Sequence, residues 1–229
     1  MTNVGFRVFT KINRPAAELI EGFRGIPVAN VADIMNRSCV LDARIQKIST
    51  PDLLGCAFTV KVRPGDNLML HKALHMAQPG DIIVVDAHGD ITNSITGELM
   101  MRTALTKKLG GVIIDGAIRD VATLSQLDMP IYAAGVTAAG PYKDGPGEIG
   151  TPISVGSVVV HPGDIIIGDD DGIVVVSPKE APELIEKARK KHADEEAIIK
   201  AIEENTRDYS WIDRELEKKG CEIIDDYYR

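Results

Sequence analysis

Two short groups of residues in this chain have the types needed to bind a small anionic molecule together with a metal ion. Gly97 and Glu98 precede a run with helical periodicity, and Arg119 and Asp120 follow a short apolar run. The first backbone N–H groups of a helix have no partner inside it, so they suit an anion. An arginine guanidinium binds a carboxylate through two parallel hydrogen bonds. An aspartate supplies an oxygen ligand to a hard cation. The sequence therefore predicts a site for a small carboxylic acid and a divalent metal.

A helix and a strand must bring these two groups together. The apolar spacing predicts a helix over residues 97–109, with Gly110 as its left-handed exit, and a strand buried on both faces over residues 112–114. Because a helix and a closely following strand pack antiparallel, the start of the helix and the end of the strand lie on the same side. Gly116 is expected to allow a sharp turn beside a ligand.

The same residues resemble the RraA-like family over about residues 25–175. That family includes the class II, metal-dependent aldolases of 4-hydroxy-4-methyl-2-oxoglutarate and 4-carboxy-4-hydroxy-2-oxoadipate, and also regulators of ribonuclease activity. The resemblance implies an α/β fold: a β/β/α swivelling-type sandwich core with N-terminal helices and a C-terminal helical extension, assembled as a homotrimer or homohexamer. The motifs that carry it are Gly97-Glu98-Leu99-Met100, Asp115-Gly116 and Arg119-Asp120.

The resemblance also assigns roles to the residues that match its motifs. Asp120 would bind the metal, Mg²⁺ or Mn²⁺, and Arg119 would bind the substrate and stabilise an enolate oxygen. Glu98 would contact the metal through water, which gives three catalytic candidates. The pyruvate carboxylate would be held by the backbone amides of Gly97, Glu98, Leu99 and Met100.

A neighbouring subunit completes the site in the family with an acidic residue from its C-terminal region. Here Glu195 or Glu196 would fill that role, and the sequence does not choose between them. It names no side chain as the general base.

The implied reaction is aldol cleavage of a 4-hydroxy-2-oxo dicarboxylic acid to pyruvate and a second oxo acid. Its leaving species is the pyruvate enolate, which a lysine Schiff base or a divalent metal can stabilise. Because no lysine of this chain stands in an apolar stretch, the metal route is favoured. Oxaloacetate decarboxylation passes through the same enolate. The alternative is a regulator of ribonuclease activity that acts by protein–protein binding. A methyltransferase is disfavoured because a glycine-rich cofactor loop after a first strand is lacking.

Composition limits the classes of partner. The 229 residues are 44% hydrophobic and carry a formal net charge of −8, which argues against a partner held by its phosphates, as nucleic acids are. There is neither an apolar run of membrane length nor a signal-peptide pattern, so no membrane partner is expected. The three cysteines lack metal spacing and suit a reducing cytoplasm.

The remaining chain predicts a catalytic domain over residues 1–176 and a C-terminal helix and tail over residues 177–229 that contact another subunit. Pro-Gly-Asp occurs three times, beginning at Pro64, Pro79 and Pro162, and each copy predicts a turn with glycine at positive φ.

Four features near the expected site leave alternatives open. Asn67 belongs either to the pocket or only to a helix cap, and Ser94 or Thr96 could cap the helix at Gly97. His88, in a polar loop expected between a buried strand and the lead-in to the helix, is a weak candidate at the rim of the site. The loop over residues 137–150 is a lid, a subunit contact or only a long connection.

Overall fold

The computed structural model describes residues 3–227, which form eleven strands and seven helices. The strands are β1 (Phe6–Val8), β2 (Gln46–Lys47), β3 (Leu53–Val62), β4 (Asp81–Thr96), β5 (Gly111–Ile118), β6 (Ile131–Val136), β7 (Gly147–Ile149), β8 (Ile153–Val155), β9 (Val158–Val160), β10 (Ile165–Asp169) and β11 (Gly172–Val176). The helices are α1 (Ala17–Glu21), α2 (Val28–Ile34), α3 (Leu68–Met76), α4 (Glu98–Thr106), α5 (Val121–Leu124), α6 (Ala181–Glu203) and α7 (Ser210–Lys218).

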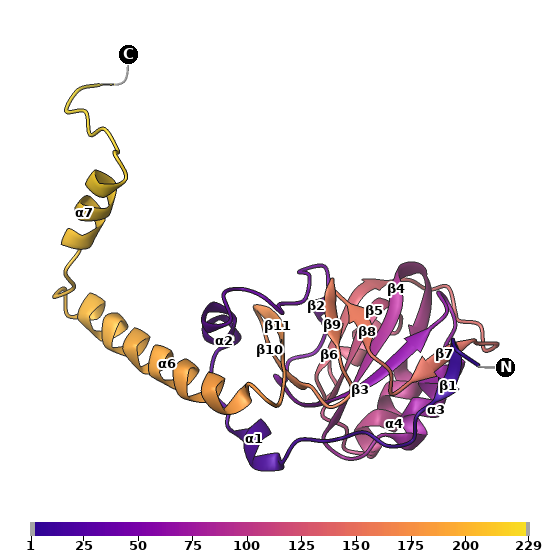
Figure 1. The fold of residues 1–229 in the computed structure, drawn as a ribbon. Helices are drawn as coiled ribbons and strands as arrows, with labels where there is room; N and C mark the ends of the chain where they lie inside the picture. The colour runs from indigo at the N-terminus through magenta and orange to yellow at the C-terminus, as the bar shows by residue number, and fades with distance from the viewer. Residues whose placement is uncertain (1–2, 228–229) are drawn as a thin grey trace. The chain divides into compact units, whose positions relative to one another are not determined.

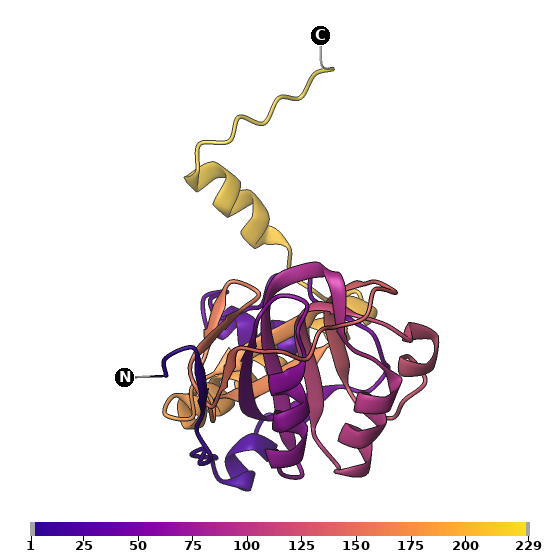
Figure 2. The same ribbon diagram turned by 90° about the vertical axis from the view of Figure 1, so that its right-hand side faces the viewer.

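A nine-stranded sheet organises the fold, in the order β1-β7-β3-β4-β5-β6-β2, with β10 pairing both β3 and β11. Its central strands β3, β4, β5 and β6 are parallel neighbours. A parallel pair needs a crossover, and α3, α4 and α5 supply the three in turn. Figure 1 shows α3 and α4 on the same side of this sheet, and Figure 2 shows the strand nearest the N-terminus at one edge of it.

Alternate residues of the central strands enter different cores because side chains in a strand point to opposite faces. Ile83 and Val85 of β4 pack in the core that includes α3, α4 and α5. Ile82 and Val84 pack in a second core with the β8–β9 hairpin, β10 and β11. Both faces of β4 are therefore covered, by helices on one and by strands on the other. The predicted α/β class is confirmed, and its layers are β, β and α.

The three Pro-Gly-Asp segments form turns with glycine at positive φ, as predicted. Gly65, Gly80 and Gly163 have φ of 71°, 84° and 97°. In each turn the aspartate N–H donates to the carbonyl oxygen of the residue before proline, over 3.0–3.1 Å. A side chain with a Cβ is strained in this conformation, which is why glycine occupies it each time.

Three local expectations were wrong. Lys108, with φ of 57°, and not Gly110 takes the left-handed conformation after α4. Gly116 lies inside β5 and does not form a turn beside a ligand; a Cβ there would lie 2.9 Å from that of Ala87, so the residue allows close packing of β4 on β5. The segment around His88, expected as a loop between a strand and the helix lead-in, lies within the irregular strand β4.

The chain divides into two compact units, one ending at Arg189 and the other beginning at Lys190. The division falls inside α6. The predicted boundary between residues 176 and 177 stays a prediction. The second unit contains α7, whose exposed apolar side chains include Trp211. A contact of this part with another subunit stays a prediction. Between residues 3 and 227, the helices are too short or too polar to cross a bilayer.

An ion pair joins the segment between β1 and α1 to the start of β4. Arg14 donates from Nε and Nη2 to the two carboxylate oxygens of Asp81, each over 2.7 Å, and Asp81 is only 2% exposed. Such paired hydrogen bonds between charged groups are stronger than neutral ones.

Replacing Arg14→Met should lower the free energy of unfolding by about 2 kcal/mol, because the Asp81 carboxylate stays buried without its cation. Urea denaturation measures this change. Arg24→Met is the matched control. Arg24 pairs with Glu21 at an exposed position, so loss of this ion pair should change the free energy of unfolding little. Equal losses in the free energy of unfolding for the two variants would contradict a stabilising role of the Arg14–Asp81 ion pair.

Candidate active site

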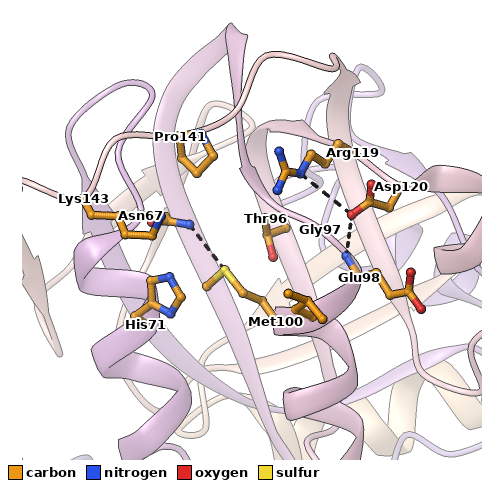
Figure 3. Close-up of a pocket in the computed structure, with 11 residues that line it drawn as sticks. Asn67, His71, Thr96, Gly97, Glu98, Met100, Arg119, Asp120, Pro141 and Lys143 are labelled. Carbon is orange, nitrogen blue, oxygen red and sulfur yellow. Dashed lines mark hydrogen bonds and ion pairs between the residues drawn. The ribbon is translucent and has the colours of Figure 1, made fainter.

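A pocket of about 170 Å³ lies where α3, the end of β4, the start of α4 and the segment after β5 meet. Figure 3 shows Arg119 and Asp120 on one side of it and Asn67, His71 and Lys143 on the other. The lining residues are Asn67, His71, Thr96, Gly97, Glu98, Leu99, Met100, Arg119, Asp120, Pro141 and Lys143.

The two predicted groups of residues meet directly. The backbone N–H of Glu98 donates to Oδ2 of Asp120 over 2.9 Å (Figure 3). This hydrogen bond joins the segment after β5 to the first turn of α4, so the expected juxtaposition is found. Ser94 and Thr96 do not cap α4: its N-cap is Gly97, and the side chain that satisfies its first N–H is Asp120.

Asp120 is held in an uncommon backbone conformation. Its φ and ψ are 62° and 30°, in the left-handed region that aspartate tolerates better than most residues. It also precedes α5 and accepts backbone hydrogen bonds from Thr123 and Leu124. Such conformations persist where surrounding contacts fix them, and they cluster at functional sites. The backbone thus turns the carboxylate toward α4.

Gly97 is required by space and not by its backbone angles. Its φ of −163° is open to any residue. A Cβ at this position, however, would collide with Oδ2 of Asp120 and lie 3.0 Å from Cγ of Arg119. Only glycine lets these two side chains lie against the start of α4.

The pocket offers several unused donors. Neither Leu99 nor Met100 donates its backbone N–H to a described residue, whereas the N–H of Glu98 donates to Asp120. The start of α4 therefore has fewer free N–H groups for a substrate carboxylate than predicted. Arg119 lies 3.8 Å from Asp120, measured from Nε to Oδ2, and its side chain is about half exposed (Figure 3). It donates no side-chain hydrogen bond within residues 3–227, so its guanidinium is available to a ligand.

Asp120 is suited to one kind of metal ion. Its Oδ1 has no hydrogen-bond partner in the described part of the chain, and the described residues contain no group of three or more histidine, cysteine, aspartate or glutamate side chains arranged around a metal. A closed cage of such side chains is therefore not formed by residues 3–227 of this chain. One carboxylate beside an open pocket fits Mg²⁺ or Mn²⁺, because Mg²⁺ keeps several waters and takes other ligands from its substrate.

The other predicted carboxylates already have partners. Arg102 donates from Nε to Oε1 of Glu98 over 2.7 Å, one helical turn away. Glu195 lies 2.8 Å from Lys191, and Glu196 lies 3.8 Å from His192, both within α6. The catalytic role of Glu98 and the choice between Glu195 and Glu196 stay predictions.

Asn67 belongs to the pocket and does not cap α3 with its side chain. Its Nδ2 donates to the carbonyl oxygen of Ile95 over 3.0 Å, which fixes the amide orientation. Its Oδ1 and the hydroxyl of Thr96 are buried without a partner among the described residues. Buried polar atoms of this kind usually meet water or a ligand.

His71, Pro141 and Lys143 also line the pocket, and sequence reasoning missed them. His71 follows Asn67 by one helical turn, a spacing that could have indicated it. Burial, Lys143 and His75 lower the pKa of His71, so its imidazole is neutral near pH 7. Lys143 is exposed and makes no ion pair within residues 3–227.

The structure bears on two further features that the sequence left open near the site. His88, the weak candidate, does not line the pocket; its N–H donates to Asp86 instead. Of the alternatives for the loop over residues 137–150, a free lid does not fit residues 137–145. Ser94 donates from its N–H and its hydroxyl to the carbonyl of Ala139, and Asn93 donates to that of Gly140. The loop is a fixed wall of the pocket.

Comparison with known proteins places this geometry in a family. The sequence profile of the RraA-like family, described as Aldolase/RraA, matches residues 28–175. The chain belongs to the RraA-like family. A protein of Halalkalibacterium halodurans named "Putative 4-hydroxy-4-methyl-2-oxoglutarate aldolase" is 41% identical over 189 residues, which are 82% of this chain and 90% of that protein.

Two solved structures share the RraA-like fold. Streptomyces coelicolor RraAS2, described as an unusual member of the RNase ES inhibitor RraA protein family, superposes with a TM-score of 0.72 at 27% identity, over 80% of this chain and 97% of that one. A protein from Pseudomonas syringae pv. tomato superposes with a TM-score of 0.75 at 23% identity, over 85% of this chain and 96% of that one.

The position of Lys143 in the pocket can be tested through His71. Lys143→Met should raise the pKa of His71 toward its ordinary value, because one of the positive charges that disfavour protonation is removed. Titration of the His71 ring protons by NMR measures the pKa. Lys72→Met is the control, since Lys72 neighbours His71 in sequence but does not contribute to its shift. An unchanged pKa in Lys143→Met would place that lysine away from the imidazole.

Proposed function

We propose that this protein is a divalent-metal-dependent aldolase that cleaves a 4-hydroxy-2-oxo dicarboxylic acid to pyruvate and a second oxo acid. The observation that carries the proposal is the hydrogen bond from the Glu98 N–H to Asp120, which sets a carboxylate, an arginine and open helix amides around one pocket. The name of the 41% identical Halalkalibacterium halodurans relative supports the same reaction class.

The open end of α4 suits the pyruvyl half of the substrate. The N–H groups of Leu99 and Met100 would donate to its carboxylate, with the favourable dipole of a helix start. Arg119, across the start of α4, would donate to the C2 carbonyl oxygen. These contacts place the scissile C3–C4 bond toward the middle of the pocket.

Cleavage begins when the C4 hydroxyl loses its proton. The new C4 carbonyl forms as the C3–C4 bond breaks. The electron pair of that bond moves through C3 to the C2 oxygen, which gives the enolate of pyruvate. Protonation at C3 then yields pyruvate. Arg119 would stabilise the enolate oxygen, where charge develops in the transition state. A divalent cation at Asp120, when bound, supplies Lewis-acid stabilisation of the same charge. Decarboxylation of oxaloacetate requires the same enolate, so we propose it as a side activity.

Lys143 would bind the second carboxylate of the substrate. It lies on the side of the pocket opposite Arg119 (Figure 3). A cation without an ion pair in the described chain suits a second anionic group. This arrangement favours dicarboxylic substrates over monocarboxylic ones.

Asp120→Asn should lower kcat/KM for 4-hydroxy-4-methyl-2-oxoglutarate at least about a hundredfold, because the amide replaces the anionic ligand of the cation. Pyruvate release, coupled to lactate dehydrogenase, measures it. Asp128→Asn, at an exposed position outside the pocket, should keep full activity. Near-normal turnover by Asp120→Asn would rule out its proposed role.

Removal of the metal gives an independent test. EDTA should abolish pyruvate release, and excess Mg²⁺ or Mn²⁺ should restore it, because an ion that keeps several waters and has Asp120 as its direct protein ligand is weakly held. Undiminished activity in EDTA would overturn the metal dependence.

A second candidate is a regulator that inhibits a ribonuclease by direct contact. The likeness to RraAS2 of Streptomyces coelicolor favours it, since that protein is described within an RNase ES inhibitor family. Binding would not need the chemistry of Asp120. Inhibition of an RNase E-type nuclease by both the wild type and Asp120→Asn, without pyruvate release by either, would favour this function.

A further inference from the structure

We infer that Asp66 is a positioning residue that holds Lys143 in the pocket, and through it sets the preference for substrates with a second carboxylate. The inference rests on the proposed function, in which Lys143 binds that carboxylate. Asp66 itself does not line the pocket. It acts through the backbone of the segment that carries Lys143.

The three Pro-Gly-Asp turns supply an internal comparison. All three share one backbone hydrogen bond, so their local geometry is alike. In two of them the carboxylate accepts from a backbone N–H of its own turn: Asp81 accepts from that of Gln78 over 2.8 Å, and Asp164 accepts from that of His161 over 2.7 Å. Asp81 also binds Arg14, as described above. Asp66 accepts no hydrogen bond from the backbone N–H of Arg63, although the Arg63 guanidinium lies 3.5 Å from its Oδ2. The hydrogen bonds of its carboxylate go to backbone N–H groups outside the turn, which the turn itself does not require.

That segment is the loop of Lys143. Oδ2 of Asp66 accepts from the N–H of Asp144 over 2.6 Å and from that of Gly145 over 3.0 Å. Its Oδ1 accepts from the N–H of Leu68 over 2.9 Å, at the start of α3. Asp66 is fully buried, so these hydrogen bonds to a carboxylate form away from competing water.

Backbone pairing extends the clamp to the residue before Lys143. Tyr142 donates its N–H to the carbonyl of Gly65 over 2.8 Å and accepts from the N–H of Asn67 over 3.0 Å. Lys143 is therefore fixed on both sides, by Tyr142 and by Asp144. Because Asp66 also holds the start of α3, it sets the distance between Lys143 and His71, which that helix carries.

Asp66→Asn tests this role with two substrates. The amide keeps the size of the side chain but replaces one acceptor oxygen by a donor that opposes an N–H group. We expect the KM for 4-hydroxy-4-methyl-2-oxoglutarate to rise about tenfold, with kcat changed less than about twofold, because Lys143 is displaced from the second carboxylate. For 4-hydroxy-2-oxopentanoate, which has only one carboxylate, both constants should stay within about twofold.

A thermodynamic cycle shows whether the effect passes through Lys143. The double variant Asp66→Asn/Lys143→Met should bind the dicarboxylate no more weakly than Lys143→Met alone, since the group that Asp66 positions is already absent. Asp164→Asn is the matched control: it loses a buried aspartate of the same motif, outside the pocket, and should show no substrate selectivity. Hydrogen exchange should accelerate at Asp144 and Gly145 in Asp66→Asn only.

Equal losses on the two substrates, an unchanged KM, or additive effects in the cycle would each overturn the inference in favour of a purely structural Asp66. If the wild type cleaves neither substrate, the proposed function fails separately. The inference is then judged by calorimetry with 2-oxoglutarate and pyruvate: a fall in the affinity ratio of the two for Asp66→Asn, and not for Asp164→Asn, supports it, and an unchanged ratio overturns it.

Discussion

The site depends on one hydrogen bond, from the N–H of Glu98 to the carboxylate of Asp120. It connects the beginnings of two successive crossovers, so the carboxyl ends of β4 and β5 and the first turn of α4 are held together. The bond needs the left-handed backbone of Asp120 and the missing side chain of Gly97. Each requirement is local, but the two residues meet only because β4 and β5 are parallel neighbours. The charge of the carboxylate also suits the positive end of the helix dipole.

A rigid frame lies behind that bond. The central strands are apolar on both faces, and the helices and the β8–β9 hairpin cover them. Close packing of this kind leaves little freedom for the strand ends, and the polar residues that follow them are held in place. The loop over residues 137–145 is fixed by hydrogen bonds that it accepts from Asn93 and Ser94 and by one that it donates to Asp66. The pocket is therefore bounded by fixed segments on both sides, which suits a reaction that requires aligned groups.

The sequence predicted the elements whose signals are local. The helix predicted over residues 97–109 is found as α4, and the strand predicted over residues 112–114 lies within β5, which begins one residue earlier and ends four residues later. Gly110, Gly116 and His88 were misassigned because each needs knowledge of a neighbouring strand. Lys108 takes the left-handed position after α4, and β4 runs through the segment of His88. Period and turn residues do not report such long-range pairing.

The sequence by itself determined the family, the α/β class and the pairing of Gly97-Glu98 with Arg119-Asp120, because these follow from residue types at fixed spacing along a helix and a strand. Only the tertiary structure decided that the Glu98 N–H is already used by Asp120, that Glu98 itself pairs with Arg102, and that His71 and Lys143 complete the pocket. The three Pro-Gly-Asp turns give the physical reason. Identical local sequences form the same backbone turn, but what each carboxylate binds depends on which segment the fold places beside it.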